Sequence, residues 1–134
     1  RESVLYPGTK QRSDAELEAL MKLCHIGYLS KYLSEEADWS HVFSVGEQQR
    51  LAFVRAIIYE PEWLFMDEST SALDEQTESA MYSLVKEKLI HTTVVSVGHR
   101  STLNKFHQKE LYLDKITKVV SLKENTQTIN TKGE

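Results

Sequence analysis

The chain has 134 residues, about the size of one domain, of which 40% are hydrophobic and 27% are charged. This balance argues against wholesale disorder, and a formal net charge of −4 without a basic block argues against nucleic acid as the main partner. No apolar run approaches the roughly 18 residues that cross a bilayer, so we expect any membrane role to come through a partner. The single cysteine, Cys24, lies among apolar residues, which predicts a buried thiol in a reducing compartment.

The first element expected along the chain is a helix. Residues 1–12 show no clear period, but Ser13 and Glu16 then form a capping box. Apolar residues recur at helical spacing after it, at Leu17, Leu20, Met21 and Cys24. These signals predict a helix over residues 14–25.

A second helix is expected after a stretch in which Trp39 is the only strong packing anchor. Ser44 and Glu47 form another capping box at its start. The helix must end before Pro61, because the residue ahead of a proline avoids the helical region. One face of this helix is apolar and should lie in the core: Leu51, Val54, Ile57 and Ile58.

A strand, a helix and a second strand are expected next. Residues 63–66 are a short continuous apolar run, typical of a strand covered on both faces. Residues 92–97 are β-branched and predict a second buried strand. The helix between them, residues 75–89, has one apolar side, formed by Met81, Leu84, Val85 and the hydrocarbon stem of Lys88. This order predicts two parallel strands joined by a right-handed crossover.

A hairpin is expected near the end of the chain. Residues 110–113 and 118–122 are its predicted strands, at the margin of the sheet, with the turn around Asp114 and Lys115. From Leu122 onward the chain becomes polar, and we expect a loose tail.

Polar side chains follow both strands of the predicted parallel unit. Asp67 and Glu68 end the first strand, and His99 follows the second. Because open parallel sheets bind ligands at the carboxyl ends of their strands, we expect the three side chains to meet at one edge. Asp67 could then hold Mg²⁺, Glu68 could act as a general base on water, and His99 could hydrogen-bond a terminal phosphate. The alternative is that the acid pair caps a turn and the histidine is an ordinary edge residue.

The N-terminus of the second predicted helix is a candidate anion site. Backbone N–H groups collect at this positive helix end, and its glycine lets a ligand approach the backbone. The residues concerned are Ser44, Val45, Gly46 and Glu47. Taken alone, the pattern equally fits an ordinary capped helix, and most capped helices bind nothing.

These segments together resemble the motifs of the ATP-binding-cassette (ABC) ATPases. Residues 43–50, Phe-Ser-Val-Gly-Glu-Gln-Gln-Arg, resemble the signature motif, and residues 63–68 resemble the Walker B strand with its catalytic glutamate. Residues 71–74, Ser-Ala-Leu-Asp, resemble the D-loop, and His99 resembles the switch histidine. The order of these motifs and the gaps between them make the match very specific.

Two of the motifs narrow the resemblance to one branch of the family. The Val-Gly-Glu form of the signature and residues 96–103 are similar to a branch that contains peroxisomal fatty-acyl transporters and related bacterial inner-membrane transporters. Ser69 stands where alanine is more usual, which is a mild departure.

The resemblance implies an α/β fold: a partial P-loop NTPase fold of the ABC cassette type, with a parallel sheet core, flanking helices and a remnant of the helical subdomain. None of the five glycines begins the phosphate-cradling pattern G-x-x-x-x-G-K-[ST]. We therefore expect the C-terminal part of a cassette, with the P-loop portion absent. Its regions would be the helical subdomain remnant with the signature helix (1–60), the α/β core (61–122) and a polar tail, expected to be disordered (123–134).

The resemblance also implies a mechanism, in which two cassettes sandwich two ATP molecules together with Mg²⁺. Residues 44–47 would bind ATP across the interface between the cassettes. Asp67, as the metal ligand, Glu68 and His99 would act in their own subunit. Asp74 would contribute to nucleotide binding by linking the two sites. Without the main phosphate cradle, the isolated chain is predicted to be inactive.

The partners implied are a second cassette, in a homodimer, and a transmembrane domain in the same full-length chain, with no nucleic acid. The expected location is the cytoplasmic side of a bacterial inner membrane, or alternatively a peroxisomal membrane. Two other functions stay open from the sequence. One is a non-catalytic, cassette-like interaction module, and the other is a soluble ABC ATPase without a transport role.

Overall fold

The computed structural model describes most of the chain: residues 2–6, 11–35, 42–98 and 100–125. The chain forms two compact units, residues 1–97 and 98–134, which are described separately below. The boundary expected at residue 60 therefore lies inside the first unit. The predicted anchor Trp39 and the predicted switch residue His99 are outside the described residues.

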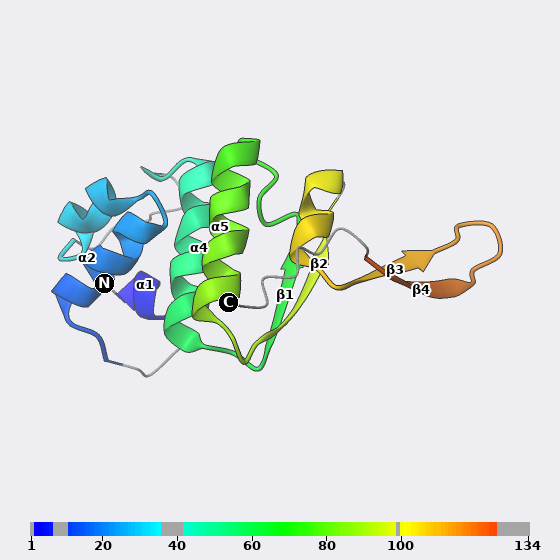
Figure 1. The fold of residues 1–134 in the computed structure, drawn as a ribbon. Coiled ribbons are helices and arrows are strands. Elements are labelled where there is room, and N and C mark those ends of the chain that lie inside the picture. The colour runs from blue at the N-terminus through cyan, green and yellow to red at the C-terminus, as the bar shows by residue number, and fades with distance from the viewer. Residues whose placement is uncertain (1, 7–10, 36–41, 99, 126–134) are drawn as a thin grey trace. The chain divides into compact units, whose positions relative to one another are not determined.

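The first unit begins with helices, which are α1 (Glu2–Leu5), α2 (Asp14–Leu23), the 3₁₀ helix η1 (Gly27–Tyr32) and α4 (Val45–Tyr59) (Figure 1). The capping box predicted for α2 is confirmed, with the Ser13 N–H donating to Oε2 of Glu16 at 2.8 Å. The helix ends at Leu23, two residues before the predicted end. The short helix α1 lies where the sequence shows no clear period.

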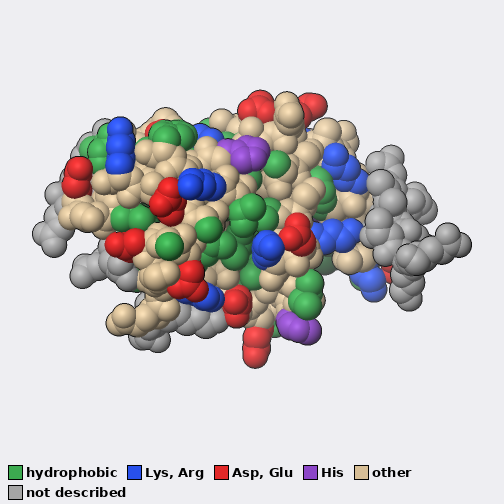
Figure 2. Space-filling model, turned by 60° about the vertical axis from the view of Figure 1, so that its left-hand side comes forward, with side chains coloured by type: hydrophobic (Ala, Val, Ile, Leu, Met, Phe, Trp, Pro, Cys, Tyr) green, Lys and Arg blue, Asp and Glu red, His purple; other side chains and the backbone are tan. Residues whose placement is uncertain are grey.

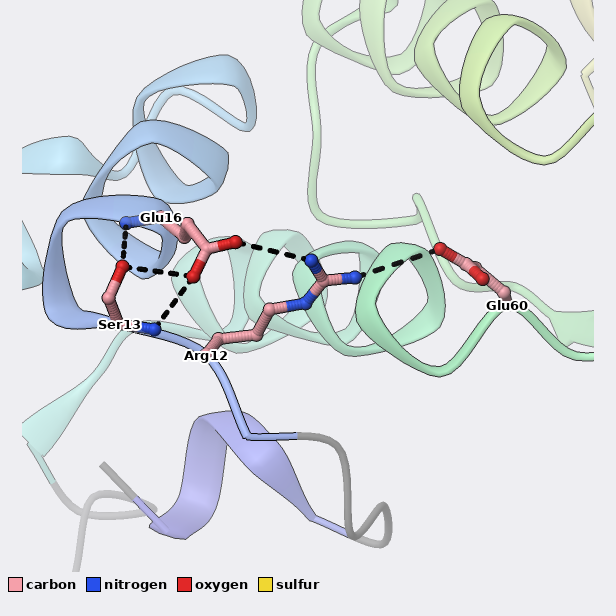
Figure 3. Close-up of polar contacts among 4 residues, drawn as sticks. All are labelled: Arg12, Ser13, Glu16 and Glu60. Atoms are coloured by element: carbon pink, nitrogen blue, oxygen red, sulfur yellow. Dashed lines mark hydrogen bonds and ion pairs between the residues drawn. The ribbon is translucent and has the colours of Figure 1, made fainter.

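One arginine ties the start of α2 to the end of α4 (Figure 3). A guanidinium nitrogen of Arg12 lies 3.3 Å from Oε1 of Glu16, and another lies 3.8 Å from Oε1 of Glu60. Glu60 is the C-cap of α4 and has a left-handed backbone, with a φ of 52°. Because the carboxylates are exposed, these ion pairs add little stability, but they relate the two helix ends.

The core of the first unit forms around α4. The predicted apolar face of this helix is confirmed, because all of its members are buried: Leu51, Val54, Ile57 and Ile58. The ring of Phe53, also buried, meets that of Tyr82 edge-on, with the centroids 6.4 Å apart. Cys24 is buried as predicted, and burial raises the pKa of its thiol to about 12.

The predicted strand–helix–strand unit is present, as β1 (Trp63–Asp67), α5 (Glu75–Lys88) and β2 (Thr93–Val97). The two strands are parallel, in a register that runs from Trp63 opposite Thr93 to Asp67 opposite Val97. In the ribbon, α4 and α5 lie side by side (Figure 1). The apolar side predicted for α5 is buried except at Lys88, which is exposed, while Tyr82 and Glu78 are buried in addition.

The prediction that both strands are covered on both faces is wrong. Trp63 is 58% exposed and Phe65 72% exposed, and their rings stack with centroids 6.2 Å apart. Val95 and Val97 are exposed on the same face of β2. The opposite face carries the buried Met66 and receives α5, whose Tyr82 hydroxyl donates to Oγ of Ser96 at 3.2 Å. The apolar side chains of β1 alternate between the two faces of the sheet, and α5 covers only one of these faces.

The second unit contains the 3₁₀ helix η2 (Ser101–Phe106) and a hairpin of β3 (Lys109–Leu113) and β4 (Val120–Glu124). The strands are antiparallel, so the predicted hairpin is confirmed, although it forms a sheet of its own among the described strands. Oδ1 of Asp114 accepts the N–H groups of Ile116 and Thr117 in the turn. The strand β4 includes Lys123 and Glu124, which the sequence placed in the tail. Residues 126–134 lie outside the described residues.

The surface mixes charges of both signs. On the face drawn in Figure 2, Lys and Arg side chains are interspersed with Asp and Glu, and hydrophobic side chains lie between them. This agrees with the small formal net charge of −4. Within the described part of the chain, no helix is long and apolar enough to span a lipid bilayer.

Candidate functional site

The first turn of α4 is held by a closed set of hydrogen bonds. The Ser44 N–H donates to Oε2 of Glu47 at 2.7 Å, and the Glu47 N–H donates back to Oγ of Ser44 at 3.3 Å. The Ser44 hydroxyl also donates to the same carboxylate oxygen, at 2.8 Å. The capping box predicted here is therefore confirmed. In this arrangement the hydroxyl proton of Ser44 is directed at its own helix.

Two side chains tie this turn to the preceding helical segment. The hydroxyl of Tyr28 in η1 donates to Oε1 of Glu47 at 2.6 Å, which is the main reason why the pKa of Glu47 lies below its ordinary value. Arg50 donates to the carbonyl of Gly46 at 3.1 Å and to the carbonyl of His25 at 2.9 Å. Sequence reasoning missed both links, because neither spacing nor residue type indicates a contact between segments about 20 positions apart.

Gly46 brings the start of α4 against the loop that follows β1. A Cβ atom at this position would lie 3.4 Å from the carbonyl oxygen of Ala72 and 3.5 Å from a methyl carbon of Leu73. The glycine thus permits a close approach of the backbone to residues 71–74. Val45, next to it, is exposed, so part of the helix end faces solvent. The N–H groups of Ser44 and Glu47 are bonded in the capping box, so in the described contacts the N–H groups that this helix start offers to an anion are those of Val45 and Gly46.

The backbone at the end of β1 is unusual. Asp67 is the last residue of the strand, and Glu68 after it has a φ of 46°, in the left-handed region. For a residue other than glycine this conformation costs about 1–2 kcal/mol. The N–H of Glu68 donates to the carbonyl of Val97 at 3.0 Å, and its carbonyl accepts the N–H of Ser71 at 3.0 Å. Such strain persists only where the surrounding contacts hold it, and it is common at functional sites.

Gln49 connects the two segments. Its Nε2 donates to the carbonyl of Glu68 at 3.3 Å and to the hydroxyl of Ser71 at 3.0 Å, and its Oε1 accepts the N–H of Ala72 at 3.1 Å. The sequence placed Gln49 in a motif but assigned it no contact. Its spacing from Gly46 was the available signal. Residues three apart share a helix face, so Gln49 lies on the same face of α4 as Gly46, which approaches Ala72.

The loop after β1 is also anchored to α5. The hydroxyl of Thr70 donates to Oε2 of Glu78 at 2.5 Å, and the two residues are only 3% and 2% exposed. Sequence reasoning missed this pair. Glu78 precedes Met81 by three positions and Tyr82 by four, so it shares the buried face of α5, and this spacing could have indicated its burial.

Asp74 is the N-cap of α5. Its Oδ1 accepts the N–H of Thr77 at 2.9 Å, and its Oδ2 accepts the hydroxyl of Thr77 at 2.9 Å. These bonds hold the pKa of Asp74 below its ordinary value, and the bond from the Thr77 backbone N–H has the largest effect. The structure therefore gives Asp74 a role in starting its own helix, a role that the sequence did not assign to it.

Comparison with known proteins finds relatives that are named as ABC transporter proteins. An uncharacterized ABC transporter ATP-binding protein of Haemophilus influenzae is 47% identical over 114 residues, which are 85% of this chain and 19% of the relative. ABC transporter D family member 2, chloroplastic, of Arabidopsis thaliana is 43% identical over 106 residues, 78% of this chain and 15% of the relative. The human lysosomal cobalamin transporter ABCD4 is 36% identical over 124 residues, which are 84% of this chain and 20% of the relative. No family model matches.

The chain belongs to the ABC transporter ATP-binding family. The resemblance drawn from the motifs is thereby confirmed. The chain spans between 15% and 20% of the length of these relatives. The motif names of the resemblance are kept below as labels: signature helix for α4, Walker B strand for β1 and D-loop for residues 71–74.

The Walker B residues suit a Mg²⁺ site only in part. Among the described residues, no group of three or more His, Cys, Asp or Glu side chains is arranged to hold a metal ion. Mg²⁺ usually keeps several waters and takes one or two carboxylates together with phosphate oxygens. Asp67, exposed at the end of the Walker B strand, fits such a site as a single protein ligand.

Of the three side chains predicted to lie together, the structure describes two, Asp67 and Glu68. Asp67 and Glu68 lie at the carboxyl end of β1, directly beside Val97 at the end of β2. His99 is outside the described residues, so its approach to the acid pair stays a prediction.

Proposed function

We propose that this chain is the C-terminal part of the ATP-hydrolysing subunit of an ABC transporter, which couples ATP hydrolysis to transport across a membrane. The relatives support this function over a soluble ABC ATPase or an interaction module, because they are named as transporter proteins. The P-loop that cradles the phosphates would come from a part of the subunit outside these 134 residues.

The observation that carries the proposal is the contact between the signature helix and the loop after the Walker B strand. Gly46 and Gln49 of α4 meet Ala72 of the D-loop, and the carbonyl of Glu68 is part of the same network. The signature helix and the loop that follows the proposed general base are therefore joined directly, which supports the proposal that they serve one reaction. A helix that is merely capped would not need this contact.

In the proposed reaction, Glu68 accepts a proton from the water that attacks the terminal phosphate of ATP. Asp67 would hold Mg²⁺ together with phosphate oxygens, and that ion would neutralise charge that develops on the phosphates. His99 would hydrogen-bond the terminal phosphate. The exposed position of the acid pair at the end of β1 supports these roles, because water and nucleotide can reach it.

The signature residues 44–47 would act on ATP bound by a second cassette. The positive end of α4 suits a phosphate, and the exposure of Val45 supports access to it from another molecule. Asp74 would take part at the same interface and link the two nucleotides. The partners proposed are thus a second copy of the cassette and a transmembrane domain in the same full-length chain. The proposed location is the cytoplasmic side of a bacterial inner membrane.

The test uses the complete subunit that contains this chain. Glu68→Gln should lower the ATP turnover number by about 10²-fold or more, because that is the usual contribution of a general base, while ATP binding is preserved. The matched control is Glu62→Gln, the same change at the exposed residue just before the Walker B strand, which should keep full turnover. Turnover at the original rate in Glu68→Gln removes Glu68 from the role of base. A complete subunit that hydrolyses no ATP would overturn the proposed function itself.

A further inference from the structure

We propose that Gln49 is a positioning residue for ATP hydrolysis, which holds the backbone of Glu68 in the conformation that directs its carboxylate at the water. The inference deepens the proposed function and rests on it, because it assumes that Glu68 is the base. It concerns a residue of the signature helix that lies beyond the residues proposed to bind ATP.

Both the nitrogen and the oxygen of the Gln49 side-chain amide form hydrogen bonds with the loop after β1. Its nitrogen donates to Glu68 O and Ser71 Oγ, and its oxygen accepts the N–H of Ala72. An amide has an NH₂ donor and an oxygen acceptor side by side, whereas an ionised carboxylate has acceptors alone. A carboxylate of the same size would keep the bond from Ala72 but would place an oxygen against the carbonyl of Glu68.

The backbone conformation of Glu68 explains why this contact matters for chemistry. With a φ of 46°, Glu68 stands in a region that an L-residue leaves unless its peptide groups are held. Val97 holds its N–H, while Ser71 and Gln49 hold its carbonyl. Loss of the Gln49 bond removes a constraint on that carbonyl, so the peptide can turn and carry the side chain with it. A shift of about 1 Å at a reacting group can cost roughly 10²-fold in rate.

The contact of Gln49 joins two elements with different proposed roles. Gln49 is on the helix whose first turn carries Ser44 and Gly46, whereas the loop that it holds follows the Walker B strand. One side chain therefore joins the residues proposed to act on the partner's nucleotide with the residue proposed to act on the chain's own nucleotide. The hydroxyl of Ser44, by contrast, donates to Glu47 of its own helix.

The decisive experiment compares Gln49→Glu and Gln49→Ala in the complete subunit, with kcat, KM for ATP and the number of ATP molecules bound measured on the same preparation. We expect kcat to fall by about 10-fold to 10²-fold in both variants, with KM and bound ATP unchanged. The control is Gln11→Glu, the same charge change at an exposed residue ahead of α2, which should leave every quantity unchanged.

A merely structural role predicts a different result. If Gln49 only kept the helix and the loop folded together, bound ATP would fall in step with kcat, and that outcome overturns the proposal. Full kcat in Gln49→Glu also overturns it. If Glu68→Gln is inactive but Gln49→Glu is fully active, this inference fails while the proposed function stands. If the unchanged subunit hydrolyses no ATP, the proposed function fails first, and this inference fails with it.

A second readout does not depend on activity. Hydrogen exchange followed by mass spectrometry on the complete subunit should show faster exchange in the segment 68–73 for Gln49→Ala, because the N–H of Ala72 loses its acceptor. Gln11→Glu should leave this segment unchanged. Equal exchange in Gln49→Ala and the unchanged protein would show that the amide does not hold the loop, and the proposal would fall.

Discussion

Tyr28 and Glu47 are 19 positions apart, yet the phenol hydroxyl donates a 2.6 Å hydrogen bond to the carboxylate. The other oxygen of the same carboxylate accepts the N–H and the hydroxyl of Ser44. One carboxylate therefore joins the 3₁₀ helix η1 to the first turn of the signature helix. The orientation of that turn depends on a residue outside the signature motif.

The first prediction concerns this link. Tyr28→Phe removes the hydroxyl and should lower the free energy of unfolding by about 0.5–1 kcal/mol at pH 7, a modest amount because the pair is largely exposed. It should also raise the pKa of Glu47 toward its ordinary value, since the Tyr28 hydroxyl is the main cause of its depression. Urea unfolding measures the first effect, with Tyr59→Phe at the exposed last residue of α4 as the control.

The stabilisation by this link should depend on pH in a defined window. The folded-state pKa of Glu47 is depressed, so its contribution is complete above the ordinary value of 4.5 and is lost as the pH falls through the folded value. The folded-state pKa of Tyr28 is raised, chiefly by its bond to Glu47, so that contribution is complete below 10.0 and is lost as the pH rises further. An equal difference between Tyr28→Phe and the original chain at pH 7 and at a pH well below 4.5 would contradict this reading.

The second prediction concerns the buried pair of Thr70 and Glu78. Thr70→Val keeps the side-chain shape but removes the hydroxyl that bonds the Glu78 carboxyl group at 2.5 Å. The free energy of unfolding should fall by about 1–3 kcal/mol, because both groups are buried. The same substitution at the exposed Thr93, at the start of β2, should change it by no more than about 0.5 kcal/mol. Equal effects at the two positions in denaturant unfolding would show that the buried bond contributes no stability.

The third prediction concerns the exposed apolar face of the β1–β2 sheet. Trp63, Phe65, Val95 and Val97 share this face, and the isolated chain should bury it by self-association. Phe65→Thr should raise the dissociation constant by roughly tenfold or more, because burial of a phenylalanine contributes about 1.5–3 kcal/mol. Ile90→Thr, at an equally exposed position outside the two strands, should leave association unchanged. A single sharp monomer peak of the original chain over a wide range of concentrations in size-exclusion chromatography would count against this.

The fourth prediction concerns nucleotide binding by the isolated chain. Its 134 residues contain no P-loop pattern, and Asp67 cannot hold Mg²⁺ strongly without phosphate oxygens that share the ion. The chain alone should therefore bind MgATP with a Kd above roughly 1 mM, which corresponds to about −4 kcal/mol, and should hydrolyse none. Calorimetry checks the binding, with the complete subunit as the positive control. Micromolar binding by the chain alone would show that the phosphate cradle is dispensable.

Local signals in the sequence were enough to predict the elements that carry the site. Ser44 and Glu47 predicted the start of the signature helix, and the β-branched residues before Gly98 predicted a strand parallel to β1. Capping boxes and strand patterns are decided by residues a few positions apart, so they can be read without the fold. The family could likewise be inferred from the order of its motifs, and the relatives confirmed it.

The contacts that support the site could not be inferred in this way. The bonds of Gln49 to Ala72 and of Tyr28 to Glu47 join segments 23 and 19 positions apart. They exist only because helix packing brings those segments together. The apolar run of β1 showed a strand that needs cover, but only the structure showed which face α5 occupies and that Phe65 stands on the other. Sequence periodicity thus determined which elements form, while the tertiary structure decided what each side chain meets, because that depends on packing between distant parts of the chain.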